Sequence, residues 1–283
     1  MKALLKMKIK ETAYNPGFYI TVTIALVLSH FLIEGFVLCV ESSGFNYAAT
    51  PLYGFIGRTL NGIFGPAFTD RVFAAGPFLF SSAVSFALCF LFLSIISIFR
   101  FCFEKSTGVI EFVCCGPVDI RRYGTAVFFR DCLFLGISSG GIIIYNLTSA
   151  AAANLVFGPG DLVFSLILMA AGIVFFLYGN LLSMLASTAA SALLSYLGVF
   201  ALFLMVLTAG YADAAGYMGN LFQNVSRFLQ WFSPLFYMQS AVKAFFFLRP
   251  LNLVLSFLAL SALGGGIYGA VRMAGRGKGR FAE

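Results

Sequence analysis

Two ionisable side chains in the first apolar stretch have a spacing that suits chemistry. His30 and Glu34 are four residues apart, so on a helix they share a face and can pair. Ionisable groups inside a membrane-spanning segment are candidates for ion transfer or for part of a translocation path. Alternatively, Glu34 lies near the outer interface, within two turns of Glu41, and is hydrated there.

Other reactive centres are not encoded. His30 is the only histidine, and the six cysteines contain no C-x-x-C pair, so we predict no metal site. The sequence offers no Ser-His-Asp arrangement and no paired carboxylates, which predicts no catalytic residue and no enzyme activity in this chain. It also lacks G-x-x-x-x-G-K-[ST], the phosphate-binding loop of many ATPases. The chain is therefore expected to bind no cofactor of its own.

A second motif lies in the polar segment at residues 100–124. Ser106-Thr107 can cap a helix that begins near Gly108, and Gly116-Pro117 ends it about two turns later. Glu111 falls in its first turn or two. The other side of this helix is apolar, with Val109, Ile110, Phe112 and Val113. A short helix of this composition suits docking into a groove of a partner protein.

The composition indicates which elements position these residues. Hydrophobic residues make up 60% of the 283 residues and charged residues 10%, against about 45–50% and 25% in soluble proteins. These values, with a mean hydropathy of +0.95, exclude soluble, disordered, coiled-coil and disulfide-scaffold classes. They predict an all-α, polytopic integral membrane protein that forms one transmembrane domain over residues 1–283. The net charge of +7 comes from scattered residues, so no nucleic-acid partner is predicted.

Six stretches are long and apolar enough to cross about 30 Å of hydrocarbon as helices. They lie at residues 17–40, 77–99, 126–145, 162–185, 189–209 and 251–271. Residues 41–76 are expected to form an outer loop. Residues 210–250 are too apolar for a solvated loop and predict short re-entrant or interfacial helices, with an ordinary structured loop as the alternative.

A short helix over residues 2–14 is expected to precede the first span. Lys2, Lys6 and Lys10 form one arc of this helix, and Leu4, Met7 and Tyr14 lie roughly opposite. Such a helix would lie in the inner headgroup region with its lysines toward anionic membrane lipids. A simple positively charged flank is the alternative interpretation.

The distribution of Lys and Arg predicts the orientation. Six spans place both termini on one side, and 13 of the 18 cations then fall on that side, Arg130 among them. Both termini are therefore expected to be cytoplasmic, in the cell (inner) membrane. The Asn146-Leu147-Thr148 sequon would lie on the outer side. The pairs Gly136/Gly140 and Gly265/Gly269 would allow close helix approach, within the chain or in a dimer.

The segment from Glu104 to Asp119, E-K-S-T-G-V-I-E-F-V-C-C-G-P-V-D, resembles the loop after the second span in type 2 ABC transporter permeases. That family's pattern is approximately E-x-x-x-G-T-x-E-x-L-L-x-x-P-V. The matching positions are Glu104, Gly108, Glu111, Pro117 and Val118. The Asn15-Pro16 break after a basic helix is similar to the family's N-terminal elbow, and Ser233-Pro234-Leu235 to its outer re-entrant region.

This resemblance implies a permease subunit that exports a lipophilic or amphipathic substrate. The segment at residues 100–124 would contact the ATPase through Glu104, Gly108, Glu111, Phe112 and Pro117. Two copies of a cytosolic ABC ATPase subunit would bind ATP and Mg²⁺, and a second permease copy or a related permease would complete the pathway.

Two rival functions stay open. In an ion- or proton-coupled secondary transporter, His30 and Glu34 would carry the coupling ion. The second rival function is that of a membrane scaffold that transports nothing. The sequence identifies no substrate, and import is an alternative to export.

Overall fold

A computed structural model describes residues 2–41, 50–114, 119–214 and 220–277. Within these ranges the side chains at 63, 64, 111, 114, 209–214, 220–223 and 275–277 are also outside the description. The described backbone is helical with short connections and contains no strand. Six of the helices begin at a proline, whose fixed φ suits the first helical position and whose missing N–H is not needed there.

Six helices are long and apolar enough to cross a membrane. They are α2 (Pro16–Glu41), α5 (Phe78–Ser106), α7 (Ile120–Ala152), α8 (Pro159–Leu185), α9 (Ala189–Ala214) and α12 (Pro250–Gly277). The chain is therefore an all-α polytopic membrane protein, as its composition predicted. Helices α5 and α7 extend beyond the apolar segments expected from hydropathy, because their polar ends continue as helix.

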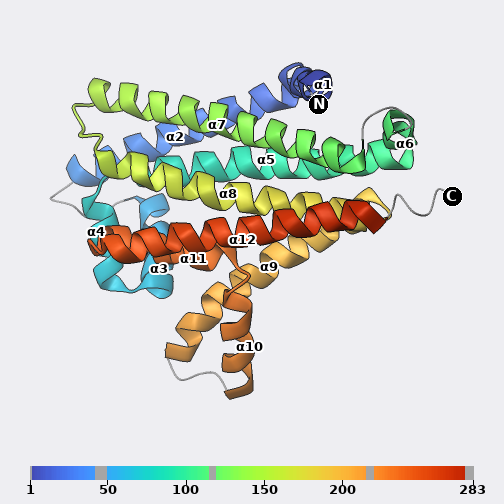
Figure 1. Ribbon diagram of the computed structural model, residues 1–283. Coiled ribbons are helices and arrows are strands. Elements are labelled where there is room, and N and C mark those ends of the chain that lie inside the picture. Colours follow the sequence, from blue (N-terminus) through green and yellow to red (C-terminus); the bar gives the residue numbers. More distant parts are fainter. Residues whose placement is uncertain (1, 42–49, 115–118, 215–219, 278–283) are drawn as a thin grey trace.

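The long helices form one bundle around α5. Helix α5 contacts α2, α7, α8 and α9, and α12 packs on α8 at the other side of the bundle (Figure 1). Helices α9 and α12 are the least covered spans, each with 22% of its most apolar window buried. Lipid or a second protein must cover the remaining apolar surface.

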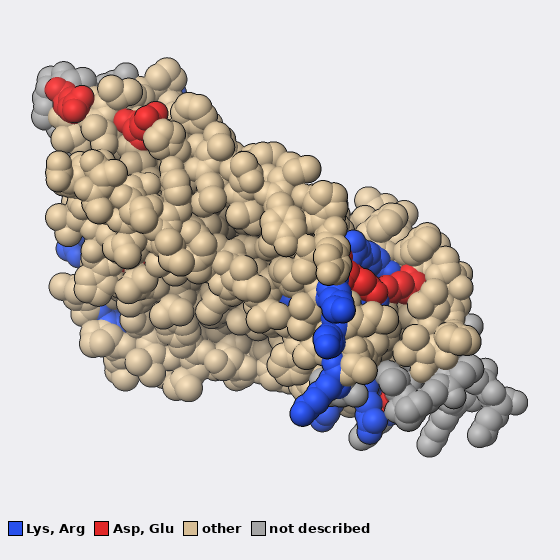
Figure 2. All heavy atoms as spheres, turned by 90° about the horizontal axis from the view of Figure 1, so that it is seen from above, with Lys and Arg blue, Asp and Glu red and all other residues tan. Residues whose placement is uncertain are grey.

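The two ends of the bundle carry different short helices. Helices α1 (Lys2–Ala13) and α6 (Val109–Cys114) lie near the end at which α12 finishes, which we call the α1–α6 end (Figure 1). Helices α3 (Pro51–Phe64) and α4 (Pro66–Ala74) lie at the opposite, α3–α4 end. Figure 2 shows Lys and Arg in a band near the α1–α6 end, whereas the middle of that face carries almost no charge.

The expected outer loop at residues 41–76 was wrong for residues 51–74, which form α3 and α4 except at Gly65. Gly65 separates the two helices. Its φ is +84°, a backbone conformation that residues other than glycine rarely adopt. Tyr53 fixes α3 to the first span, since its hydroxyl donates a hydrogen bond of 2.6 Å to the carbonyl of Leu32. Burial raises the pKa of Tyr53 above its ordinary value.

Helices also occupy the apolar segment at residues 210–250. Helix α10 (Asn220–Gln230) turns back along α9, and α11 (Pro234–Phe246) packs between α8 and α12. Figure 1 shows α10 and the end of α9 projecting sideways from the bundle. Short helices were therefore predicted correctly, and α11 reaches the α3–α4 end.

Candidate functional site

Helix α1 packs against the bundle through a different face from the one predicted. Leu4, Lys8 and Thr12, spaced four residues apart, are buried, whereas Met7 and Tyr14 are exposed. Hydropathy cannot find this face because its central residue is a lysine. The exposed side keeps Lys2, Lys6 and Lys10, as the helical wheel predicted.

An ion pair fixes α1 to the end of the second span. The Lys8 ammonium contacts the carboxylate of Glu104 on α5 and lies 3.1 Å from a carboxylate oxygen of Glu11. It also lies 5.0 Å from the ring centroid of Tyr123 on α7, a cation–π contact. Glu104, predicted to contact an ATPase subunit, thus has a partner within its own chain.

The connection from α5 to α6 depends on a glycine. Gly108 has a φ of +74°, which explains why this position, predicted as a site residue, suits glycine. The expected capping by Ser106 or Thr107 is not seen: Ser106 ends α5 and Thr107 is its C-cap, and both hydroxyls donate hydrogen bonds of 2.9 Å to the carbonyl of Phe103 on α5. Because α5 runs to Ser106, the polar connection is shorter than the predicted 100–124.

Helix α6 has one buried and one exposed apolar side. Ile110 is 2% exposed and packs with residues of α1, α5 and α7, whereas Phe112 is 83% exposed and Val109 43%. The predicted site residues Glu111, by its side chain, and Pro117 lie outside the described residues. The described part of α6 therefore exposes the Phe112 ring at the α1–α6 end, while Ile110 packs the helix against the core.

A second ion pair lies inside the bundle and was missed in the sequence. Arg130 and Asp131 on α7 are buried, and the guanidinium donates hydrogen bonds of 2.9 and 2.6 Å to one carboxylate oxygen. Ser97 on α5 donates to the other oxygen at 2.6 Å and accepts from Arg130 at 3.0 Å. Counting Arg130 with the surface cations was therefore wrong.

Further polar groups from two more helices lie beside this pair. The Tyr196 hydroxyl on α9 donates to Ser94 at 3.1 Å, and Asn180 on α8 donates to the carbonyl of Gly124 at 3.0 Å. Asp131, Asn180 and Tyr196 line a small shared cavity. The Asn180 side-chain oxygen is buried and has no hydrogen-bond partner within the described part of the chain.

His30 and Glu34 form the pair that their spacing predicted, but on the surface of the bundle. The Nε2 of His30 lies 3.1 Å from a carboxylate oxygen of Glu34, and the side chains are 54% and 58% exposed. They face away from the core in a single chain. Their assignment to a translocation path therefore stays a prediction that requires a second copy.

The structure also describes the surroundings of the sequon and of the paired glycines. Asn146 is fully buried and bonds to Ser81 at 2.6 Å and to Ser82 at 3.0 Å, so its sequon is not an accessible acceptor. No described neighbouring atom lies within 4 Å of a Cβ placed at Gly136 or Gly140, or at Gly265 or Gly269. Of the two alternatives, close helix approach within the chain or in a dimer, the first is therefore wrong for these glycines.

No protein-family model matches this chain, and no curated protein or solved structure compared with it matches either. The similarity of residues 104–119 to the permease loop therefore remains a resemblance.

Proposed function

We propose that this chain is the permease subunit of an ATP-driven transporter of the type 2 ABC class, with export as its direction. Its substrate would be lipophilic or amphipathic. A separate cytosolic ATPase subunit, in two copies, would bind ATP and Mg²⁺. A second permease copy would complete the pathway, in the cell (inner) membrane with both termini cytoplasmic.

One observation carries the proposal: α6 packs on the bundle through Ile110 and at the same time exposes Phe112. Ile110 holds the helix to the core, while Phe112 is 83% exposed. Burying a phenylalanine side chain contributes about 1.5–3 kcal/mol, so a partner groove would gain most from this residue. Motion of that partner would pass through α6 into both α5 and α7, which it joins.

The ion pair between Lys8 and Glu104 supports the same role. It fixes α1 to the end of α5, only a few residues before α6 begins. Force applied at α6 would therefore act on α1 and α5 together instead of bending one helix end. In this proposal Glu104 is a positioning residue, and Phe112 is the contact residue.

The test is purification of the full-length chain from native membranes in a mild detergent, followed by mass spectrometry and ATPase assay. We expect an ATPase that contains a phosphate-binding loop to co-purify in stoichiometric amount. Phe112→Ala should weaken that association about tenfold or more, through loss of the buried ring. The matched control is Phe103→Ala, which removes another exposed ring at the same end of the bundle.

Equal ATPase recovery with wild type and Phe112→Ala would contradict the role of α6. Absence of any such ATPase from an active preparation would contradict the proposed class.

A second candidate function is ion- or proton-coupled transport by the chain alone. The observation that favours it is the enclosed Arg130–Asp131 pair beside a small cavity, since ionisable groups within a membrane bundle often mark ion pathways. Uptake or efflux in vesicles that contain only this chain, driven by an imposed proton gradient and without ATP, would favour this candidate over the first.

A further inference from the structure

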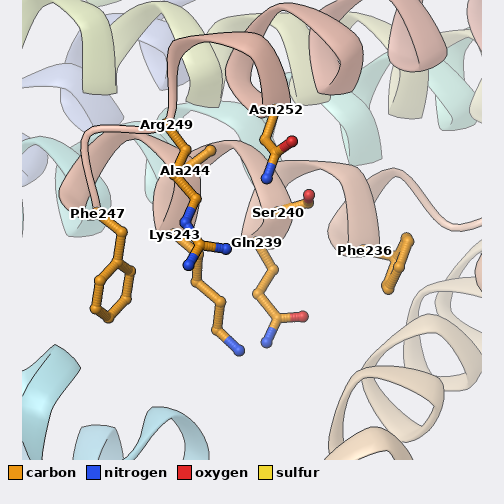
Figure 3. Close-up of a pocket in the computed structure, with 8 residues that line it drawn as sticks. All are labelled: Phe236, Gln239, Ser240, Lys243, Ala244, Phe247, Arg249 and Asn252. Atoms are coloured by element: carbon orange, nitrogen blue, oxygen red, sulfur yellow. The ribbon is translucent and has the colours of Figure 1, made fainter.

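A cavity of about 390 Å³ lies at the α3–α4 end, between α11 and the first turn of α12 (Figure 3). Lys243 on α11 and Arg249 in the turn before α12 provide two cations. Figure 3 shows the Lys243 and Gln239 side chains leaving α11 on the same side, with the Arg249 guanidinium beside them. Among the residues that the structure describes, no Asp or Glu lines the cavity.

Amide and hydroxyl groups add neutral hydrogen-bonding capacity to the cavity. Gln239 and Ser240 contribute from α11, and Asn252 from α12. Two cations with several neutral donors are a suitable set for a phosphate group, which accepts charge-assisted hydrogen bonds. A concave surface that carries one sign of charge also concentrates counter-ions more strongly than a flat surface does.

A third cation lies next to the cavity. Arg71 on α4 donates a hydrogen bond of 2.8 Å to the carbonyl of Phe246, and its guanidinium lies 4.6 Å from the Phe247 ring centroid. The neighbouring Asp70 is exposed on α4 and does not line the cavity. Arg71 therefore places a further cation, from a separate element, beside Phe247.

The turn that places Arg249 has an unusual residue. Leu248 has a φ of +53°, in the left-handed region that normally favours glycine at a helix end. Two hydrogen bonds hold it, from Leu248 to the carbonyl of Phe245 at 3.1 Å and from Arg249 to that of Ala244 at 2.8 Å. This turn keeps the backbone of Arg249 close to the helical turn that carries Lys243.

An apolar track lies along the first turns of α12, the helix that contributes Asn252 to the cavity. Its members follow helical spacing, so they share one face, and each is at least half exposed: Leu251, Val254, Leu255 and Leu258. The track covers about 10 Å of a membrane span, at 1.5 Å for each residue. A charged cavity at the start of a span and an exposed apolar face along the first turns of the same helix match the two parts of a lipid.

We propose that this cavity binds the phosphate-bearing headgroup of an anionic membrane lipid, whose acyl chains lie along the exposed face of α12. Lys243 and Arg249 contact the phosphate, and Gln239 and Asn252 contact the polar remainder of the headgroup. Isolated interfacial lysines and arginines are common in membrane proteins. This pair differs because it lines a cavity with neutral donors. The proposal holds with or without an ATPase partner.

The test uses the full-length chain, purified and delipidated in a neutral detergent, and native mass spectrometry with added lipid. The probes are dioleoyl phosphatidylglycerol, dioleoyl phosphatidylcholine and inorganic phosphate. We expect phosphatidylglycerol to bind about tenfold more tightly than phosphatidylcholine, since each interfacial cation favours an anionic lipid. The double variant Lys243→Gln/Arg249→Gln should reduce the affinity for phosphatidylglycerol to that for phosphatidylcholine. The matched control, Arg58→Gln, removes an exposed cation of α3 at the same end and should leave both affinities unchanged.

Gln239→Leu provides a second variant that leaves the charge unaltered and should weaken phosphatidylglycerol binding severalfold even if the double variant fails to fold. Wild-type affinity in Gln239→Leu together with wild-type affinity in a folded double variant would overturn the proposal. Equal affinity for the two lipids would do the same. Displacement of phosphatidylglycerol by micromolar phosphate would identify free phosphate as the ligand and would overturn the lipid assignment.

Discussion

Two pairs of an acidic and a basic side chain, one on α2 and one on α7, differ in burial and in their hydrogen-bond partners. His30 and Glu34 on α2 are more than half exposed, with side chains at 54% and 58%. Arg130 and Asp131 on α7 are enclosed, with side chains at 2% and 5%, and Ser97 of another helix completes their hydrogen bonds. Each pair thus lies within a single helix, but the first is a surface contact, whereas Ser97 links the second to α5.

The difference shows that spacing predicts pairing but not burial. His30 and Glu34 are four residues apart and pair as expected, yet α2 packs through Ala25, Ser29 and Leu32 instead. Arg130 follows Tyr123 and Val127 at helical spacing on the buried face of α7. This spacing from two apolar residues was the signal in the sequence that could have predicted the burial of Arg130. It was missed because a charge near a span end normally indicates the membrane surface.

The largest effect is expected at the enclosed pair. Asp131→Ala removes the carboxylate and leaves the Arg130 guanidinium buried without its counter-charge. Removing one partner of a buried pair costs about 3–5 kcal/mol. The free energy of unfolding, measured by denaturation of the purified chain in detergent micelles, should fall by this amount. Glu34→Ala is the matched control from the exposed pair.

The double variant Arg130→Met/Asp131→Leu sharpens the test. Because apolar replacement of both partners removes the uncompensated charge, it should recover most of the lost stability. If Asp131→Ala costs no more than Glu34→Ala, the distinction between the enclosed and exposed pairs is wrong.

A smaller effect is expected at the ion pair of α1, which is only partly enclosed. Glu104→Gln leaves the buried Lys8 with Glu11 as its remaining carboxylate partner. A loss of about 2 kcal/mol is expected, within the range for a buried polar group deprived of its partner. Limited proteolysis at Lys2 and Lys6 should accelerate, since α1 detaches more often. Lys2→Gln, which changes an exposed lysine of the same helix, should leave the rate of cleavage at Lys6 unchanged.

A still smaller effect is expected where the helices are joined by hydrogen bonds between uncharged side chains. Asn146 contacts Ser29, Ser81 and Ser82 from α2 and α5. Asn146→Ala should cost about 1 kcal/mol, because hydrogen bonds between membrane helices average about 0.6 kcal/mol each. Thr148→Ala removes the sequon but not this cluster, and it should leave the free energy of unfolding unaltered. Equal losses in the two variants would contradict the assignment of Asn146.

The number and type of spans were predictable because hydropathy depends only on local composition. The helix ends were less predictable. Polar residues at the end of α5, up to Ser106, continue the helix instead of starting a loop, since Lys105 donates to the carbonyl of Met184 at the end of α8. Helices α3 and α4 were missed because Pro51, Gly65 and Pro66 in that segment indicated a loop.

The candidate site was predictable only where its residues are close in sequence. Gly108 and the apolar side of α6 follow from a few adjacent residues. The contact between Lys8 and Glu104 joins residues 96 apart, and no periodicity of either helix encodes it. The sequence alone therefore identified helix α6, but not the ion pair between Lys8 and Glu104 that joins α1 to α5.

The smallest energetic effect is expected at the exposed pair, which makes it the sharpest test of the pathway. Exposed ion pairs contribute about 0.5 kcal/mol or less, so Glu34→Cys, after removal of the native cysteines, should fold normally. A pathway between two copies would be lined by residues that are exposed in one copy. The thiol introduced by Glu34→Cys should then react, in membranes, with an impermeant maleimide in at least one nucleotide state. The thiol of Ser29→Cys, on the same helix but at a fully buried position, should not react. Complete protection of the Glu34→Cys thiol in every state would mean that lipid or another protein covers this face of α2, and it would contradict its place in a water-accessible pathway.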